Sequence, residues 1–220
     1  MSAIPVSEMC DRFSHLYTGA LTDVMDELGL FHQTLPSSLQ PLEFGSKFAG
    51  EAFPLWGVSS NRVDWDRSVR RVLECIGDAQ PHTVIVTDAS GDQSAHLGEL
   101  CVTWLKARGV RGAVINGGVR DVEYIIREQF PVFARHRTPA DCCYRWELKE
   151  WNVSVTIGAV RVSPGDFIIA DHDGVICIPQ AVAKEVLLKG EEVFNTENAI
   201  REAVRGGMPP LDAYEKFGRF

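Results

Sequence analysis

The sequence lacks the short motifs that identify several common classes of enzyme. It has no Gly-x-Gly-x-x-Gly segment or Walker loop, no serine within Gly-x-Ser-x-Gly and no His-x-x-x-His pair. We therefore expect no nucleotide site, no serine nucleophile and no zinc site. His96 lies on the loop that carries the candidate site described below, and we expect it at the surface rather than in a pocket.

Basic residues and long apolar runs are also scarce. The chain has 22 Lys and Arg against 30 Asp and Glu, a net charge of −8, which argues against broad contacts with nucleic acid or an anionic membrane. No apolar run reaches the length of a membrane span, and the first residues lack the apolar core of a signal peptide. The six cysteines include no Cys-x-x-Cys pair, which favours free thiols packed in a reducing compartment. We expect a cytoplasmic protein.

The residues that are present predict one α/β domain over residues 1–220. A chain of 220 residues with 45% hydrophobic content can bury a full core. His82–Asp88 is a β-branched run typical of a buried parallel strand, Glu99–Arg108 has helical spacing ended by Gly109, and Gly112–Ile115 is a second apolar run. Phe48–Pro54 predicts a further short strand. Beyond residue 150, alternating apolar residues separated by turns predict hairpins, so we expect a mixed sheet.

The segment from Glu99 to Asp121 is the strongest candidate for chemistry. A helix beginning at Glu99, followed by a parallel strand, places Glu99 and the Arg120-Asp121 pair at the same edge of the sheet, where ligands collect in α/β folds. The first N–H groups of the helix, from Gly98 to Cys101, can hold a carboxylate, and Arg120 can grip one in two places. Asp121 suits Mg²⁺ or Mn²⁺. On spacing alone an alternative stays open, in which Arg120 and Asp121 form a solvated pair at the start of the next helix.

Two other kinds of site find less support. Asp171–Gly174 reads Asp-His-Asp-Gly between two apolar runs and could pass for a cluster of metal ligands, but this arrangement of Asp and Gly favours a turn. A lysine Schiff base would need a desolvated lysine. Every lysine in the chain lies on an amphipathic helix, in the C-terminal tail or in polar surroundings. A metal site at Asp121 is therefore better supported than a lysine Schiff base.

Several separated motifs resemble those of one family. Glu99-x20-Arg120-Asp121, with Gly-Gly-Val before the arginine, resembles the signature of the metal-dependent 4-hydroxy-4-methyl-2-oxoglutarate aldolases, a family that also includes the regulator of ribonuclease activity A. The other matching motifs are Pro131-Val-Phe-Ala134, Thr138-Pro139, Gly165-Asp166 and the run from Asp171 to Pro179. The likeness extends from about Thr18 to about Gly206. Two positions depart from it, because the aldolases usually carry Asp in place of Glu99 and Asp-Gly-Gly in place of Asn116-Gly-Gly.

The resemblance implies a swivelling β/β/α-type fold, with Phe48–Pro54 as an outer strand, and a homotrimer or homohexamer with sites near subunit interfaces. It implies cleavage of a 4-hydroxy-2-oxo-dicarboxylate or tricarboxylate to pyruvate and a second oxo acid, with oxaloacetate decarboxylation as a side activity. Asp121 is the expected ligand of Mg²⁺ or Mn²⁺, and the expected catalytic residues are Arg120, Glu99 and Asp121, with Glu99 as a base acting through a water. The residues expected to bind the substrate are Gly98, Glu99, Leu100, Cys101 and Arg120. The competing hypothesis is a non-catalytic regulator of a ribonuclease or another protein.

Overall fold

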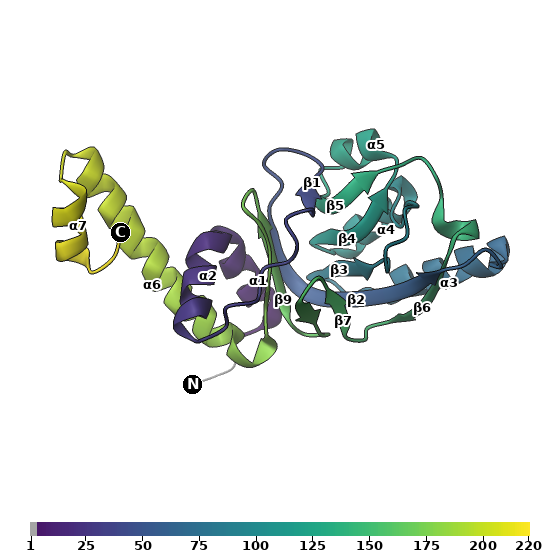
Figure 1. The fold of residues 1–220 in the computed structure, drawn as a ribbon, viewed down its shortest axis with the longest axis horizontal. Coiled ribbons are helices and arrows are strands. Elements are labelled where there is room, and N and C mark those ends of the chain that lie inside the picture. Colours follow the sequence, from purple (N-terminus) through teal and green to yellow (C-terminus); the bar gives the residue numbers. More distant parts are fainter. Residues whose placement is uncertain (1–3) are drawn as a thin grey trace.

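The structure is a computed structural model that describes residues 4–220, and its centre is a mixed β-sheet with helices packed around it (Figure 1). The helices are α1 (Val6–His15), α2 (Thr18–Glu27), α3 (Trp65–Asp78), α4 (Glu99–Arg108), α5 (Val122–Arg127), the 3-10 helix η1 (Cys142–Tyr144), α6 (Gln180–Arg205) and α7 (Pro210–Phe217). The strands are β1 (Gln40–Pro41), β2 (Phe48–Ser59), β3 (Thr83–Asp88), β4 (Gly112–Val119), β5 (Val132–Arg137), β6 (Trp146–Trp151), β7 (Val155–Ile157), β8 (Val160–Val162), β9 (Phe167–Asp171) and β10 (Gly174–Ile178).

The main sheet has eight strands in the order β1-β5-β4-β3-β2-β9-β10, with β6 also paired to β2. β2, β3, β4 and β5 run parallel, whereas β1, β6, β9 and β10 are antiparallel to their neighbours. β7 and β8 form a separate hairpin. The prediction of an α/β fold with a mixed sheet is confirmed.

Strand β2 corrects the expectation of a short outer strand at Phe48–Pro54. It has 12 residues and pairs with β3, β6 and β9, so it lies inside the sheet. Its first half, Phe48–Glu51, pairs with β9, and its second half, Leu55–Ser59, pairs with β6. Pro54, which has no N–H to donate, falls in the gap between these two antiparallel partners. A proline inside a long interior strand is tolerated for this reason.

The strand-helix-strand unit β3-α4-β4 forms as predicted. α4 begins at Glu99 and ends at Arg108, and Gly109 follows with a left-handed φ of 85° that terminates the helix. β4 continues past the predicted end at Ile115, because Gly118 and Val119 still pair with β5. The strand therefore ends immediately before Arg120 and Asp121.

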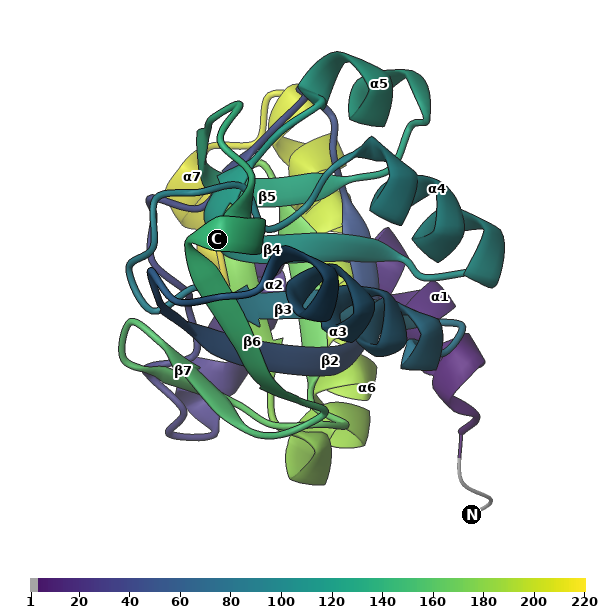
Figure 2. The same cartoon turned by 90° about the vertical axis from the view of Figure 1, so that its right-hand side faces the viewer.

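Two groups of helices cover different parts of the sheet. α3, α4 and α5 lie against the parallel strands (Figure 2), and they share a core that includes Val102, Leu105 and Ile125. α1, α2 and α6 pack against β9 and β10 in a second core. α6 then extends away from the sheet and carries α7 at its far end (Figure 1). Every helix within residues 4–220 is too short or too polar to cross a lipid bilayer.

The Asp171–Gly174 segment is the turn of the β9-β10 hairpin, as predicted. The carboxylate of Asp171 is buried and accepts hydrogen bonds from the backbone N and the Oγ1 of Thr18, each at 2.7 Å. It also accepts one from the backbone N of Asp173 at 3.0 Å. Both carboxylate oxygens are thus occupied, and the residue joins the start of α2 to the sheet.

Candidate active site

The turn between β4 and α5 holds Asp121 in a left-handed backbone conformation. Its φ is 57° and its ψ is 33°, a region that Asp adopts more readily than most residues. Its Oδ2 accepts a hydrogen bond from the backbone N of Glu99 at 3.2 Å. A Cβ at Gly98 would lie 2.7 Å from this oxygen, so a larger residue at this position would displace the carboxylate. The carboxylate therefore sits at the N-terminus of α4, where the helix dipole favours negative charge.

Arg120 is anchored through both its backbone and its side chain. Its N donates to the carbonyl oxygen of Leu97 at 3.0 Å, which ties the end of β4 to the loop before α4. Its Nη1 lies 3.1 Å from Asp141 Oδ2, and its Nε lies 3.6 Å from Asp121 Oδ2. The side chain is 39% exposed. The guanidinium is thus held in place by two carboxylates and remains accessible to an anionic ligand.

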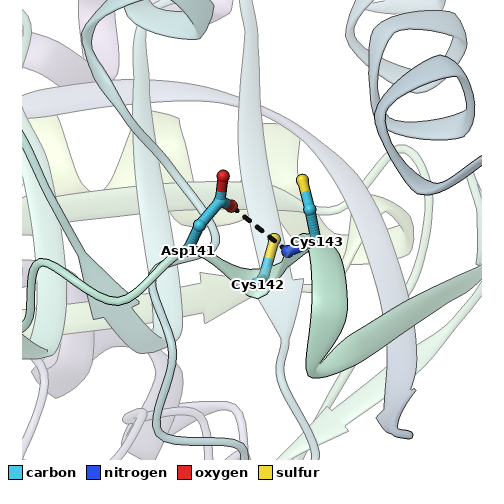
Figure 3. Close-up of side chains that lie close together, drawn as sticks. All are labelled: Asp141, Cys142 and Cys143. Carbon is cyan, nitrogen blue, oxygen red and sulfur yellow. Dashed lines mark hydrogen bonds between the residues drawn. The ribbon is translucent and has the colours of Figure 1, made fainter. Parts of the chain in front are cut away.

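Asp141 is a candidate that the sequence analysis did not single out. It follows β5, which runs parallel to β4, and so reaches the same edge of the sheet. Its Oδ1 accepts a hydrogen bond from the backbone N of Cys143 at 3.2 Å (Figure 3). Burial acts to raise the pKa of Asp141, but the bonds from Cys143 and the charge of Arg120 outweigh burial and hold the pKa below its usual value. Its place after a parallel strand was the signal that could have identified it.

These side chains border one cleft of about 300 Å³. The predicted site residues that line it are Gly98, Leu100, Cys101, Arg120 and Asp121. Asp141, apolar residues of α3, His96 with its neighbours Ala95 and Leu97, and Cys142 and Cys143 complete the lining. The structure therefore brings most of the predicted set together at the carboxyl edge of the parallel strands.

Glu99 contributes its backbone to this arrangement, while its side chain lies outside the cleft lining. Its Oε1 accepts a hydrogen bond from Thr103 Oγ1 at 3.1 Å, one turn further along α4. Its backbone N is bonded to Asp121, so the protein's own carboxylate already occupies the first N–H of the helix. The N–H groups of Leu100 and Cys101, which have no partner within the helix, remain for a substrate carboxylate.

The donors at the cleft fit a hard divalent cation at Asp121. The Asp121 side chain is 42% exposed, and within residues 4–220 its Oδ1 has no hydrogen-bond partner. Mg²⁺ and Mn²⁺ suit a site of one or two carboxylates completed by water and substrate oxygens.

A second set of possible metal ligands lies beside Arg120. The ligand atoms of Asp141, Cys142 and Cys143 are within 4.8 Å of one another (Figure 3), and this is the one such group in the described part of the chain. Thiols suit softer metals than Mg²⁺. The hydrogen bond between Cys142 and Cys143, and then burial, raise the pKa of Cys142, whereas the same hydrogen bond lowers the pKa of Cys143, so the pair does not offer two thiolates. We therefore assign this group to holding Arg120 in place through Asp141.

The expectation of a surface His96 is wrong. Its side chain is 1% exposed and packs edge-on against Trp146, with ring centroids 4.8 Å apart. Burial lowers the pKa of His96 to about 4, although Asp92 at 3.5 Å acts to raise it, so the ring is neutral at pH 7. The loop is not a free surface loop, because Ala95 bridges to the end of β4 and the backbone N of His96 donates to Gly118. This long-range pairing leaves no periodic pattern in the sequence.

Comparisons with known proteins identify the family to which this chain belongs. Residues 18–177 match the model of the RraA-like family, which is described as Aldolase/RraA. The chain belongs to the RraA-like family. A Halalkalibacterium halodurans protein provisionally named as a 4-hydroxy-4-methyl-2-oxoglutarate aldolase is 29% identical over 204 residues, which cover 92% of this chain and 91% of that protein.

Two solved structures share the fold of this RraA-like protein. An uncharacterized protein from Pseudomonas syringae has a TM-score of 0.84 at 29% identity, covering 97% of this chain and 99% of that one. Streptomyces coelicolor RraAS2, described as an unusual member of the RNase ES inhibitor RraA protein family, has a TM-score of 0.79 at 24% identity, covering 91% and 99%. The resemblance inferred from the separated motifs is confirmed, as is the fold that it implied.

Proposed function

We propose that this RraA-like protein is a divalent-metal-dependent aldolase that cleaves a 4-hydroxy-2-oxo acid to pyruvate and a second carbonyl compound. The observation that carries the proposal is the single cleft in which Arg120 and Asp121 meet the N-terminus of α4. A hard metal ligand, a guanidinium and unpaired helix N–H groups are suited to a 2-oxo acid. The name of the H. halodurans relative supports lyase chemistry. The sequence resemblance suggests 4-hydroxy-4-methyl-2-oxoglutarate or 4-carboxy-4-hydroxy-2-oxoadipate as substrate.

Each cleft residue has a role in this proposal. Asp121 holds Mg²⁺ or Mn²⁺, which when bound polarises the 2-oxo group. The N–H groups of Leu100 and Cys101 hold the substrate carboxylate, and Gly98 keeps that helix end open to it. Arg120 stabilises the oxygen on which negative charge develops as the carbon-carbon bond breaks.

Glu99 is the proposed base for the 4-hydroxyl proton. Its carboxylate is carried by the first residue of α4 and is held by Thr103, so it would act through a water rather than by direct contact. Loss of this proton lets C4 become a carbonyl while the electron pair of the C3–C4 bond stays on C3. Oxaloacetate decarboxylation leaves an electron pair on the same carbon of pyruvate and needs no hydroxyl deprotonation. We therefore propose it as a second activity.

Pyruvate release from a panel of oxo acids, with and without a chelator, tests the function. We expect release that the chelator abolishes and that excess Mg²⁺ or Mn²⁺ restores. Equal rates with and without chelator would contradict metal dependence. A lack of pyruvate from every oxo acid, oxaloacetate included, would contradict the enzyme assignment.

Regulation of another protein is the second candidate function. The description of the family joins aldolases to RraA, and the net charge of −8 would suit a basic partner. Inhibition of a ribonuclease by a preparation inert toward oxo acids would favour this function. We further propose that the protein is cytoplasmic and that it forms a homotrimer or homohexamer. Light scattering of the purified protein tests the oligomeric state.

A further inference from the structure

The candidate cleft has a polar end and an apolar end, and the function proposed above uses the polar end alone. Arg120, Asp121 and Asp141 border the polar end. The apolar end lies between α3 and the first turn of α4, two helices that lie side by side (Figure 2). This apolar end is where the part of a substrate beyond its pyruvate half would lie.

Large apolar side chains are exposed along this wall. Leu100 is 80% exposed, Leu73 54% and Trp65 48%, although such side chains are usually much more deeply buried. A second hollow of about 270 Å³ shares Leu73, Leu100 and Cys101 with the cleft and adds Ile76, Gly77 and Trp104. The two hollows therefore adjoin, and we call their apolar part, bordered by Trp65, Leu73, Leu100 and Trp104, the α3-α4 groove.

The charges around the cleft disfavour a second carboxylate in this groove. Arg120 is the one cationic side chain among the described residues that line the cleft, and it is already paired with Asp141. A substrate carboxylate in the groove would lose water against leucine and tryptophan and would find no unpaired cationic side chain there. An alkyl or aryl group there would instead remove apolar surface from water on both partners.

We propose that the substrate is a 4-hydroxy-2-oxo monocarboxylate whose C4 carries an alkyl or aryl group, and that this group occupies the α3-α4 groove. The inference rests on the proposed aldolase function and differs from the dicarboxylates and tricarboxylates that the sequence resemblance implies. Cleavage breaks the C3–C4 bond, and its electron pair remains on C3, which takes up a proton to give pyruvate. The hydroxyl proton leaves, and C4 becomes the carbonyl carbon of an apolar aldehyde or ketone. The step is balanced without an oxidant or a further reactant.

The test compares two tertiary alcohols that share the pyruvate half. Pyruvate release is measured with 4-hydroxy-4-methyl-2-oxoheptanoate and with 4-hydroxy-4-methyl-2-oxoglutarate, on the wild type, Leu73→Arg and Leu211→Arg. The rate for the glutarate is halved, because its cleavage gives two pyruvates and that of the heptanoate gives one. We expect the wild-type kcat/KM for the heptanoate to be about tenfold or more higher than that for the glutarate. Leu73→Arg places a cation in the groove and should shift this ratio about tenfold toward the glutarate. Leu211 is an exposed leucine on α7, so Leu211→Arg should leave the ratio unchanged.

Three results would overturn the inference. The first is a wild-type preference for the glutarate, and the second is a ratio that Leu73→Arg leaves unchanged in a variant whose thermal melting shows that it is folded. The third is a change in oligomer size for Leu73→Arg with an unchanged ratio, which would assign the groove to a contact with a second copy of the chain.

Oxaloacetate separates the failure of the inference from the failure of the proposed function, because its decarboxylation does not use the groove. Decarboxylation of oxaloacetate together with preference for the glutarate would contradict the groove assignment alone. Inertness toward all three compounds would contradict both.

Discussion

Asp121 and Asp171 hold equivalent positions in the two halves of the molecule. Each lies at the end of a strand and accepts a hydrogen bond from the first backbone N–H of a helix, Asp121 from Glu99 in α4 and Asp171 from Thr18 in α2. Asp171 is buried and accepts three hydrogen bonds, of which the two from Thr18 are 2.7 Å long. Asp121 is half exposed and accepts one, at 3.2 Å.

The hydrogen bonds of the two carboxylates indicate that Asp171 makes a structural contact, whereas Asp121 belongs to an open site. A carboxylate with both oxygens occupied has little capacity left for a ligand, and removing it leaves buried donors unpaired. A carboxylate with one free oxygen beside Arg120 can still bind a cation or order water around a substrate. Substitutions confined to one half are therefore expected to change either activity or stability.

Arg120→Lys should produce the largest loss of activity. Lysine keeps the charge but loses the planar fork, so transition-state stabilisation measured from kcat/KM should fall by about 2 to 4 kcal/mol. Arg127→Lys is the matched control, because Arg127 lies on α5 and pairs with Glu123 at the surface. An unchanged kcat/KM for Arg120→Lys would place Arg120 outside the site.

Glu99→Gln should affect the two proposed reactions unequally. An amide cannot accept the 4-hydroxyl proton, so aldol cleavage should fall about a hundredfold further than oxaloacetate decarboxylation. Glu99→Asp is the conservative control and should retain much of the cleavage, because an intervening water can absorb the lost methylene. Both rates are measured on one preparation of each variant. Equal losses would show that Glu99 positions the helix end and is not the base.

Asp171→Ala should reduce stability without removing activity. It leaves the buried N and Oγ1 of Thr18 without their acceptor, so the free energy of unfolding in urea should fall by about 2 kcal/mol. Asp121→Asn keeps a residue that tolerates the left-handed conformation and should change stability by less than about 0.5 kcal/mol. The reverse pattern, with Asp121→Asn the less stable variant, would contradict the comparison.

His96 should make the half that carries the site sensitive to acid. The pKa of His96 is lowered to about 4 in the folded state, whereas about 6.5 is usual for an unfolded chain. The unfolded state therefore binds more protons between these values, and stability falls as the pH falls through this window. The loss should be about 1.5 kcal/mol between pH 6.5 and pH 5. Urea unfolding of His96→Gln should show a correspondingly smaller pH dependence, and an identical pH dependence would show that His96 is not buried as a neutral ring.

Local patterns predicted the elements that carry the site. The apolar spacing of α4, the stop at Gly109 and the following strand are encoded within Glu99–Val119, and right-handed parallel topology then places both ends at one edge. The length and place of β2 could not be predicted in this way, because they depend on three partner strands that are distant in the sequence.

The parts of the site that the sequence did not predict depend on long-range contacts. Asp141 is brought to Arg120 by β5, and His96 is buried because its loop bridges to the end of β4. The orientation of the Glu99 side chain is set by Thr103, and that choice of partner cannot be read from spacing. The resemblance to the family supplied the residue types, while tertiary pairing determined which of them face the cleft.

Calorimetric titration of Mn²⁺ into the wild type, Asp121→Asn and Asp171→Asn tests the central claim most directly. If the free oxygen of Asp121 is the metal ligand, Mn²⁺ should bind the wild type and Asp171→Asn with similar affinity. Asp121→Asn, which keeps the fold but loses the carboxylate charge, should bind at least about tenfold more weakly. Equal Mn²⁺ affinity in all three proteins would contradict the account, since it would place the metal away from the carboxylate that the structure leaves open.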